Sequence, residues 1–182
     1  MGKSIALMEL KSIPIGILTA DEMLKAAEVE LILATPICPG KYIIIISGTV
    51  GPVESAMKTG IEIADSFLIG NYIIHNVHEM VPSALVGTVE IEKIEAIGAI
   101  ETITAMTSIM AGDIAVKASK IRLVEIRVAR GLGGKGFVVF TGDVASVQSA
   151  MNACENQLKE SGEIISSCVI ASPNKELISK LF

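Results

Sequence analysis

The sequence repeats itself once along its length. Residues of the first part recur 92 positions later with the same identity, and from Lys41 onward the offset is 94. The matched pairs are Ile5/Ile97, Glu9/Glu101, Asp21/Asp113, Lys25/Lys117, Ala26/Ala118, Leu31/Leu123, Lys41/Lys135, Gly48/Gly142, Val53/Val147 and Ala56/Ala150. A repeat of this length indicates one small fold present twice, because each copy carries the same apolar and polar positions. We therefore predict two domains, over residues 1–88 and 94–182.

Composition excludes several classes of protein. The 182 residues are 51% hydrophobic but only 3% aromatic, so few rings are left to stack on bases or sugars. The net charge of −5 argues against nucleic acid, since phosphate binding needs clustered Lys and Arg. No apolar stretch approaches the ~20 residues of a membrane-spanning helix, so we expect the surplus apolar surface to lie between subunits. Glu9 interrupts any signal peptide, and three cysteines without a C-x-x-C pair favour a reducing cytoplasm.

Each copy predicts the element order β-α-β-β-α-β followed by a short helix. The expected strands are 4–10, 29–33, 42–46 and 71–76 in the first copy, and 96–102, 121–129, 137–141 and 164–170 in the second. The expected helices are 19–27, 52–69 and 79–86, then 108–118, 144–160 and 174–181. Thr19, Thr49 and Asp143 are the expected helix caps. The fold class is therefore α/β (α+β), with two tandem ferredoxin-like domains.

The two copies differ most in one hairpin loop. The first copy has Thr35-Pro36-Ile37-Cys38-Pro39-Gly40-Lys41, and the second has Arg130-Gly131-Leu132-Gly133-Gly134-Lys135. The glycine-rich loop leads from one strand into another, whereas a phosphate-binding glycine loop leads into a helix. Its glycines are better explained by a tight turn and a close approach of backbones.

The pattern Asp21-x-x-x-Lys25-Ala26-Ala27-x-Val29-x-Leu31, with its copy from Asp113 to Leu123, resembles bacterial microcompartment shell proteins. The resemblance covers essentially the whole chain, and the duplication resembles their tandem-domain class, which forms trimers shaped like hexagonal tiles. The two differing loops are similar to those of iron–sulfur tandem shell proteins from propanediol-utilisation compartments.

The resemblance implies a structural role without catalysis. We expect a homotrimer, packed with other shell proteins into a shell in the cytoplasm, with Lys25 and Lys117 at the tile edges. The central pore would be lined by Ile37, Arg130, Gly131, Leu132, Gly133 and Gly134. In one respect the chain departs from the family, because Asn76 and Ser172 stand where single-domain members have an arginine at tile contacts.

Cys38 is the expected metal ligand, with Pro39 and Gly40 completing the cofactor-binding loop. A cubane [4Fe-4S] cluster normally takes four thiolates, and three copies of Cys38 around a threefold axis would supply three. The fourth iron would then carry water, hydroxide or an outside ligand. In the alternative interpretation Cys38 is a small apolar filler in a hairpin, as free cysteines often are.

Other candidate residues give weaker indications of a metal or catalytic site. His75 and His78 beside Glu79 have metal-like spacing, but they fall at a strand-to-helix junction where two imidazoles do not reliably converge. Cys154 and Cys168 are expected to pack in the core. No Ser/His/Asp set or carboxylate pair indicates a hydrolase.

Three functions remain open from the sequence. The first is a shell tile that conducts electrons through its cluster, with an encapsulated or cytosolic redox protein as a possible partner. The second is a tile whose pore passes metabolites, with Cys38 as a free thiol. The third is a soluble small-molecule sensor built on ferredoxin-like repeats.

Overall fold

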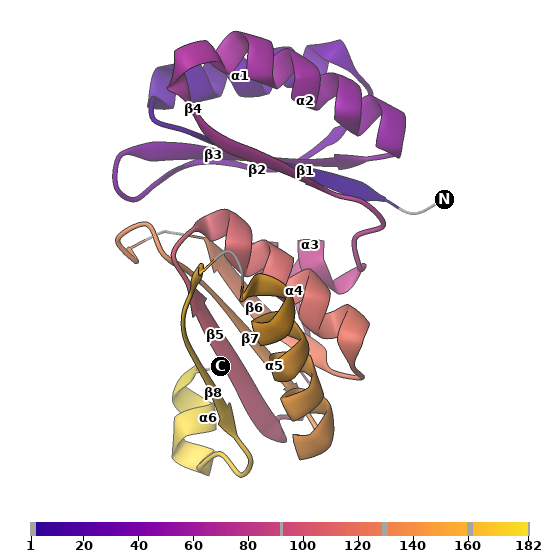
Figure 1. The fold of residues 1–182 in the computed structure, drawn as a ribbon, viewed down its shortest axis with the longest axis vertical. Helices are drawn as coiled ribbons and strands as arrows, with labels where there is room; N and C mark the ends of the chain where they lie inside the picture. The colour runs from indigo at the N-terminus through magenta and orange to yellow at the C-terminus, as the bar shows by residue number, and fades with distance from the viewer. Residues whose placement is uncertain (1–2, 92, 129–130, 160–161, 182) are drawn as a thin grey trace. The chain divides into compact units, whose positions relative to one another are not determined.

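The computed structural model describes residues 3–91, 93–128, 131–159 and 162–181. Both repeats have the predicted order of elements (Figure 1). The first comprises β1 (Ser4–Leu10), α1 (Ile13–Ala26), β2 (Glu30–Ile37), β3 (Lys41–Gly48), α2 (Val50–Ala64), the 3₁₀ turn η1 (Asp65–Phe67), β4 (Leu68–Ile74) and α3 (Met80–Val86). The second comprises β5 (Ala96–Thr102), α4 (Ala105–Ala118), β6 (Arg122–Val128), β7 (Gly136–Gly142), α5 (Val144–Leu158), β8 (Ile164–Ile170) and α6 (Lys175–Leu181).

Each repeat forms a four-stranded antiparallel sheet. The strand orders are β2-β3-β1-β4 and β6-β7-β5-β8, which confirms the ferredoxin-like prediction for both. In the first sheet Leu7 of β1 lies between Ile45 of β3 and Tyr72 of β4. β1 pairs with a neighbouring strand on each side, and all seven of its residues are buried.

Helices α1 and α2 cover one face of the first sheet (Figure 1). Alternate residues of the strands point to that face, where they form a cluster of buried apolar side chains. This core contains Ala6, Met8, Leu10, Tyr42, Ile44 and Ile46 from the sheet, with Ala20, Met23, Val53, Ala56, Met57 and Ala64 from the helices. The core is aliphatic and sulfur-rich, as the composition predicts.

The chain separates into two compact units. The first contains residues 1–77 with 130–134, and the second contains 78–129 with 135–182. α3 therefore belongs to the second unit, although it follows the first repeat in the sequence. The domain boundaries 1–88 and 94–182 stay a prediction about the repeats.

The two long helices of the first repeat differ from the sequence prediction mainly at one end each. α1 begins at Ile13 rather than at residue 19, because Ser12 is its N-cap and accepts a hydrogen bond from the Ile15 amide (3.5 Å). Thr19 lies buried in the middle of that helix, so its predicted capping role is wrong. α2 ends at Ala64 rather than at residue 69, because Asp65 takes a positive φ of 44° that breaks the helix.

Of the N-caps predicted for α2 and α5, one is confirmed by a side-chain hydrogen bond. Asp143 caps α5 and accepts the Ser146 amide at 2.8 Å, whereas Thr49 precedes α2 without a side-chain bond. Among the described residues, no helix is long and apolar enough to cross a membrane.

Candidate functional site

The first loop, Cys38–Gly40, is the turn between β2 and β3. Ile37 and Lys41 face each other across the ladder, so three residues close the hairpin. Gly40 has a φ of 67°, and a Cβ built there would meet no atom within 4 Å. Cys38 is a free, half-buried thiol. The turn therefore carries a half-buried thiol at Cys38 and open space at the Cβ position of Gly40.

The second loop, Gly131–Gly134, connects β6 and β7 in the second repeat. Gly131, Gly133 and Gly134 all have positive φ, at 71°, 62° and 96°. L-residues that carry a side chain rarely adopt a positive φ, so the glycines are needed for the turn itself. The loop leads into a strand, which agrees with a turn and not with a phosphate cradle. Arg130 lies outside the described residues.

Gly134 approaches the first loop closely. Both belong to the first compact unit, and a Cβ on Gly134 would lie 3.3 Å from the Cys38 carbonyl oxygen and 3.2 Å from Pro39 Cδ. Any side chain at Gly134 would therefore press on the backbone that carries the candidate ligand. Ile37 is buried beneath this loop, and Leu132 is half buried. Whether these residues line a pore stays a prediction.

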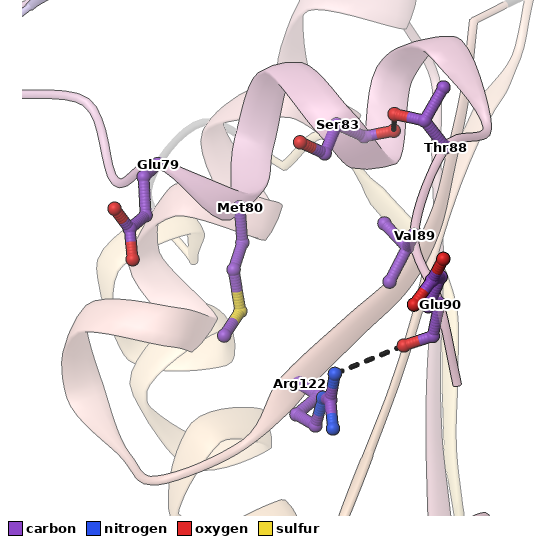
Figure 2. A pocket seen from close by; sticks show the side chains of 7 residues that line it. All are labelled: Glu79, Met80, Ser83, Thr88, Val89, Glu90 and Arg122. Atoms are coloured by element: carbon purple, nitrogen blue, oxygen red, sulfur yellow. Dashed lines mark hydrogen bonds between the residues drawn. The ribbon is translucent and has the colours of Figure 1, made fainter. Parts of the chain in front are cut away.

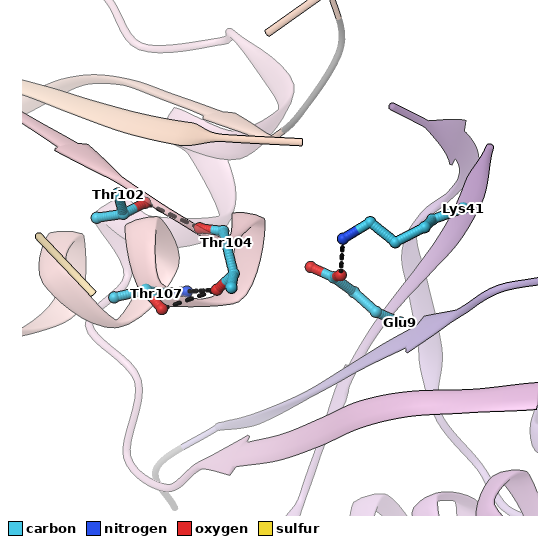
Figure 3. Close-up of polar contacts among 5 residues, drawn as sticks. All are labelled: Glu9, Lys41, Thr102, Thr104 and Thr107. Carbon is cyan, nitrogen blue, oxygen red and sulfur yellow. Dashed lines mark hydrogen bonds and ion pairs between the residues drawn. The ribbon is translucent and has the colours of Figure 1, made fainter. Parts of the chain in front are cut away.

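An ion pair stands at the base of the first loop (Figure 3). Lys41 Nζ donates to Glu9 Oε2 at 2.7 Å, and the Glu9 side chain is 1% exposed. Its second oxygen, Oε1, has no hydrogen-bond partner among the described residues. A buried carboxylate is costly unless it is paired, so Lys41 is the residue that makes Glu9 tolerable there.

The same pair recurs in the second repeat. Lys135 Nζ lies 3.3 Å from Glu101 Oε1, but these side chains are 46% and 38% exposed. Glu9 corresponds to Glu101 and Lys41 to Lys135, so duplication copied the pair and left only one copy buried. Sequence reasoning missed this feature, although all four residues were among the repeated positions.

Threonines fix the start of α4 in the second unit. Thr104 is the N-cap, and its Oγ1 accepts the Thr107 amide at 3.1 Å (Figure 3). Thr102 donates to the carbonyl of Thr104 at 2.8 Å and to that of Gly136 at 3.2 Å. These bonds tie the end of β5 to the strand that leaves the second loop. They also explain why α4 begins at Ala105, three residues before the predicted start.

The other two cysteines differ from each other. Cys154 is fully buried and donates to the Ala111 carbonyl (3.3 Å), and burial raises its pKa to about 12. It is a packing residue, as predicted. Cys168 is exposed on β8, so its predicted place in the core is wrong. β8 is an edge strand, and Cys168 lies on its open face.

No single chain offers a complete metal site in the described part of the structure. Groups of three or more His, Cys, Asp or Glu side chains that could hold an ion are absent there. His75 contacts Ser4 (3.3 Å), whereas His78 Nδ1 accepts the Met80 amide (3.3 Å). The histidines thus have separate local partners. Cys38 forms no disulfide and is half buried, and its role as a ligand shared between chains stays a prediction.

The expected edge lysines occupy equivalent positions in α1 and α4. Lys25 pairs with Asp21 and with Glu22 (3.0 Å), and the hydrogen bond that it donates to Asp21 is the main cause that raises the pKa of Lys25. Lys117 Nζ pairs with Asp113 Oδ2 at 2.5 Å. Both lysines reach the surface, so the structure is compatible with an edge role that stays a prediction.

A hollow of about 550 Å³ lies beside α3 in the second unit (Figure 2). Its lining includes Glu79, Glu90 and Arg122. The Arg122 guanidinium donates to the Glu90 carbonyl at 3.0 Å. The charged groups therefore do not converge on a common point, and the hollow offers no evident ligand site.

Known proteins resemble this chain along most of its length. The BMC domain family matches it twice, over residues 4–77 and 96–173. The bacterial microcompartment shell protein PduT of Citrobacter freundii is 36% identical over 177 residues, which cover 97% of this chain and 96% of that protein. The carboxysome shell protein CcmK2 of Synechocystis sp. is 30% identical over 83 residues, covering 43% of this chain and 81% of that protein.

Solved structures agree. A microcompartment protein from Desulfitobacterium hafniense DCB is 42% identical, with a TM-score of 0.95 over 98% of this chain and 99% of that chain. The fused permuted hexameric shell protein MSM0275 from the RMM microcompartment is 21% identical, with a TM-score of 0.63. It covers 87% of this chain and 84% of its own, and it supports the fold alone.

Proposed function

This chain belongs to the BMC domain family of bacterial microcompartment shell proteins, and on that premise we propose that three copies form one tile with an iron–sulfur site at its centre. The chain is a structural component of a microcompartment shell. Membership of this family favours the shell role over a soluble small-molecule sensor. The trimer and its central site are the proposed parts.

Duplication supports the trimer. Three chains supply six similar domains, and closed cyclic symmetry is the usual way in which identical chains associate. Large apolar side chains remain exposed on the isolated chain, among them Ile17, Ile69 and Ile103. Their burial between chains would contribute roughly 25 cal/mol per Å².

The observation that carries the central site is the accessible thiol of Cys38 at a hairpin tip. Three copies of this loop around one axis would bring three thiolates together, and Pro39 and Gly40 would shape the backbone beside them. When bound, a [4Fe-4S] cluster takes up and releases single electrons, which suits a conduit across a shell. Gly134 allows the second loop to approach Cys38, and the Glu9–Lys41 pair holds the base of the loop.

Anaerobic purification followed by iron and sulfide analysis tests the site. We expect about one cluster per trimer, as four iron and four sulfide per three chains. Cys38→Ser should remove the colour without unfolding the protein, because a hairpin tip contributes little to the core. Cys168→Ser is the matched control, since it removes an exposed thiol from another strand, and it should keep the colour. Colour that survives in Cys38→Ser would overturn the proposed ligand.

Colourless wild-type trimers would have a different meaning. With all three thiols free after anaerobic purification and reconstitution, they would favour a pore that passes metabolites. Gly134 gives such a pore specific support, because it brings no side chain against the Cys38 loop. The trimer would stand in that case, and the redox role would fall.

A further inference from the structure

The short terminal helices of the two repeats have different surroundings. α3 packs against α4 and β6 in the second unit, and its Val81 is fully buried. β4 and β8 are offset by 96 residues, and at this offset α6 corresponds to α3 to within one residue. Within the described part of the chain, α6 has no comparable packing against any helix or strand. Leu177, the counterpart of Val81, is 40% exposed.

A specific hydrogen bond accompanies the packing of α3. The His78 amide donates to Asp113 Oδ1 at 2.9 Å, while Lys117 occupies Oδ2 of the same carboxylate. His78 Nδ1 then accepts the Met80 amide at the start of the helix. Asp113 therefore accepts the His78 amide on Oδ1 and the Lys117 ammonium on Oδ2.

The first repeat has the equivalent carboxylate, but no backbone amide of the described residues donates to it. Asp21 corresponds to Asp113, and it pairs with Lys25 through Oδ2. Among the described residues nothing donates to its Oδ1. The surrounding apolar positions show the same contrast between repeats, because each is exposed in the first repeat and buried in the second. These pairs are Ile17/Ile109, Leu24/Val116 and Leu31/Leu123.

The segment before α6 has the equivalent donor, a backbone amide, but this amide has no acceptor among the described residues. Asn174 corresponds to His78, and its Oδ1 accepts the Glu176 amide at 2.8 Å, as His78 Nδ1 accepts the Met80 amide. The Asn174 amide has no partner among the described residues. Donor and acceptor are thus both present, each matching a half of the contact already formed in the second unit.

We propose that α6 of one copy docks on α1 and β2 of the next copy, as α3 docks on α4 and β6, with the Asn174 amide donating to Asp21 Oδ1. The proposal rests on the proposed trimer and specifies the contact that closes it. The partner is a second copy of this chain. Since donor and acceptor lie on different parts of the chain, the contact is head-to-tail, and three copies close it into a ring.

Crosslinking tests the contact. In a Cys38→Ser, Cys168→Ser background, Asp21→Cys with Asn174→Cys is treated with a short bismaleimide and run on a denaturing gel. We expect covalent dimers and trimers. The matched control is His78→Cys with Asp113→Cys in the same background, which should link within one chain and run as a monomer. Peptide mapping identifies the linked residues in both.

A second pair of variants measures the hydrogen bond. Asp21→Ala should weaken the trimer about ten- to hundredfold per interface, the usual effect of losing a hydrogen bond to a charged group. Asp113→Ala removes the equivalent bond inside one chain and should leave trimer dissociation unchanged. Light scattering against protein concentration gives both values.

The outcomes separate the contact from the trimer. If wild type is a trimer, but only the control pair crosslinks and Asp21→Ala dissociates as wild type does, the α6 contact is overturned and the trimer stands. If wild type is a monomer at micromolar concentration, the proposed trimer falls and takes the contact with it.

Discussion

Lys41→Met should destabilise the protein far more than the equivalent Lys135→Met. Methionine keeps the apolar stem of lysine and removes its charge. At position 41 this leaves Glu9, 1% exposed, without the one hydrogen bond that its carboxylate makes to any described residue. Removing one partner of a buried ion pair costs about 3–5 kcal/mol, because the remaining charge is buried and unpaired.

The second repeat provides the matched control. The Glu101–Lys135 pair is exposed and longer, at 3.3 Å. Exposed pairs contribute about 0.2–1 kcal/mol because water screens both charges. The two variants delete the same interaction at equivalent positions, so the difference between them, about 3 kcal/mol, reports burial alone.

Urea unfolding followed by circular dichroism measures the difference at one fixed protein concentration. At a slope of about 2 kcal/mol per molar urea, Lys41→Met should lower the midpoint by about 2 M and Lys135→Met by less than about 0.5 M. Glu9→Gln combined with Lys41→Met should recover much of the loss, because it removes the unpaired charge. Equal midpoints for the two single variants, or a double variant no better than Lys41→Met, would refute the reasoning.

Two further predictions concern the loops and the tile edge. Gly134→Ala should reduce iron bound per trimer, because its Cβ would lie 3.3 Å from the Cys38 carbonyl oxygen, whereas Gly131→Ala has open space and should bind more iron than Gly134→Ala. Equal loading of the two would show that the approach of the loops does not matter. Replacing Lys25 and Lys117 together with Ala should abolish sheets in electron micrographs while light scattering still reports the trimer; unchanged sheets would remove both lysines from the edge.

Strands were easier to predict from this sequence than helix ends. β1, β5 and β8 have the predicted bounds, because apolar runs of strand length between polar or glycine residues leave few alternatives. The start of α1 was missed, although Ser12 followed by Pro14 is a typical helix beginning. The acidic pair Asp21-Glu22 after Thr19 also resembles the first turn of a helix, so the predicted start was placed too late.

Side-chain surroundings were harder to predict than elements. The strand that holds Cys168 was found, but the sequence does not say which face of an edge strand is covered, and the residue is exposed. The Glu9–Lys41 pair could have been found, since both residues recur with a constant relation to the loop. The different packing of α3 and α6 could not have been predicted, because it depends on which surface each helix contacts.

Duplication explains why the loops differ as they do in the proposed tile. A ring of six identical domains would place six copies of one loop around the axis, and six thiols are more than one cluster can use. A duplicated chain can keep the thiol in one repeat and carry a loop without cysteine, Gly131–Gly134, in the other. The buried Glu9–Lys41 pair stands under the thiol loop, and the exposed Glu101–Lys135 pair stands under the glycine loop. In the proposed tile, the buried pair therefore lies at the base of the loop that would hold the ligand, and the glycine loop would only leave room for it.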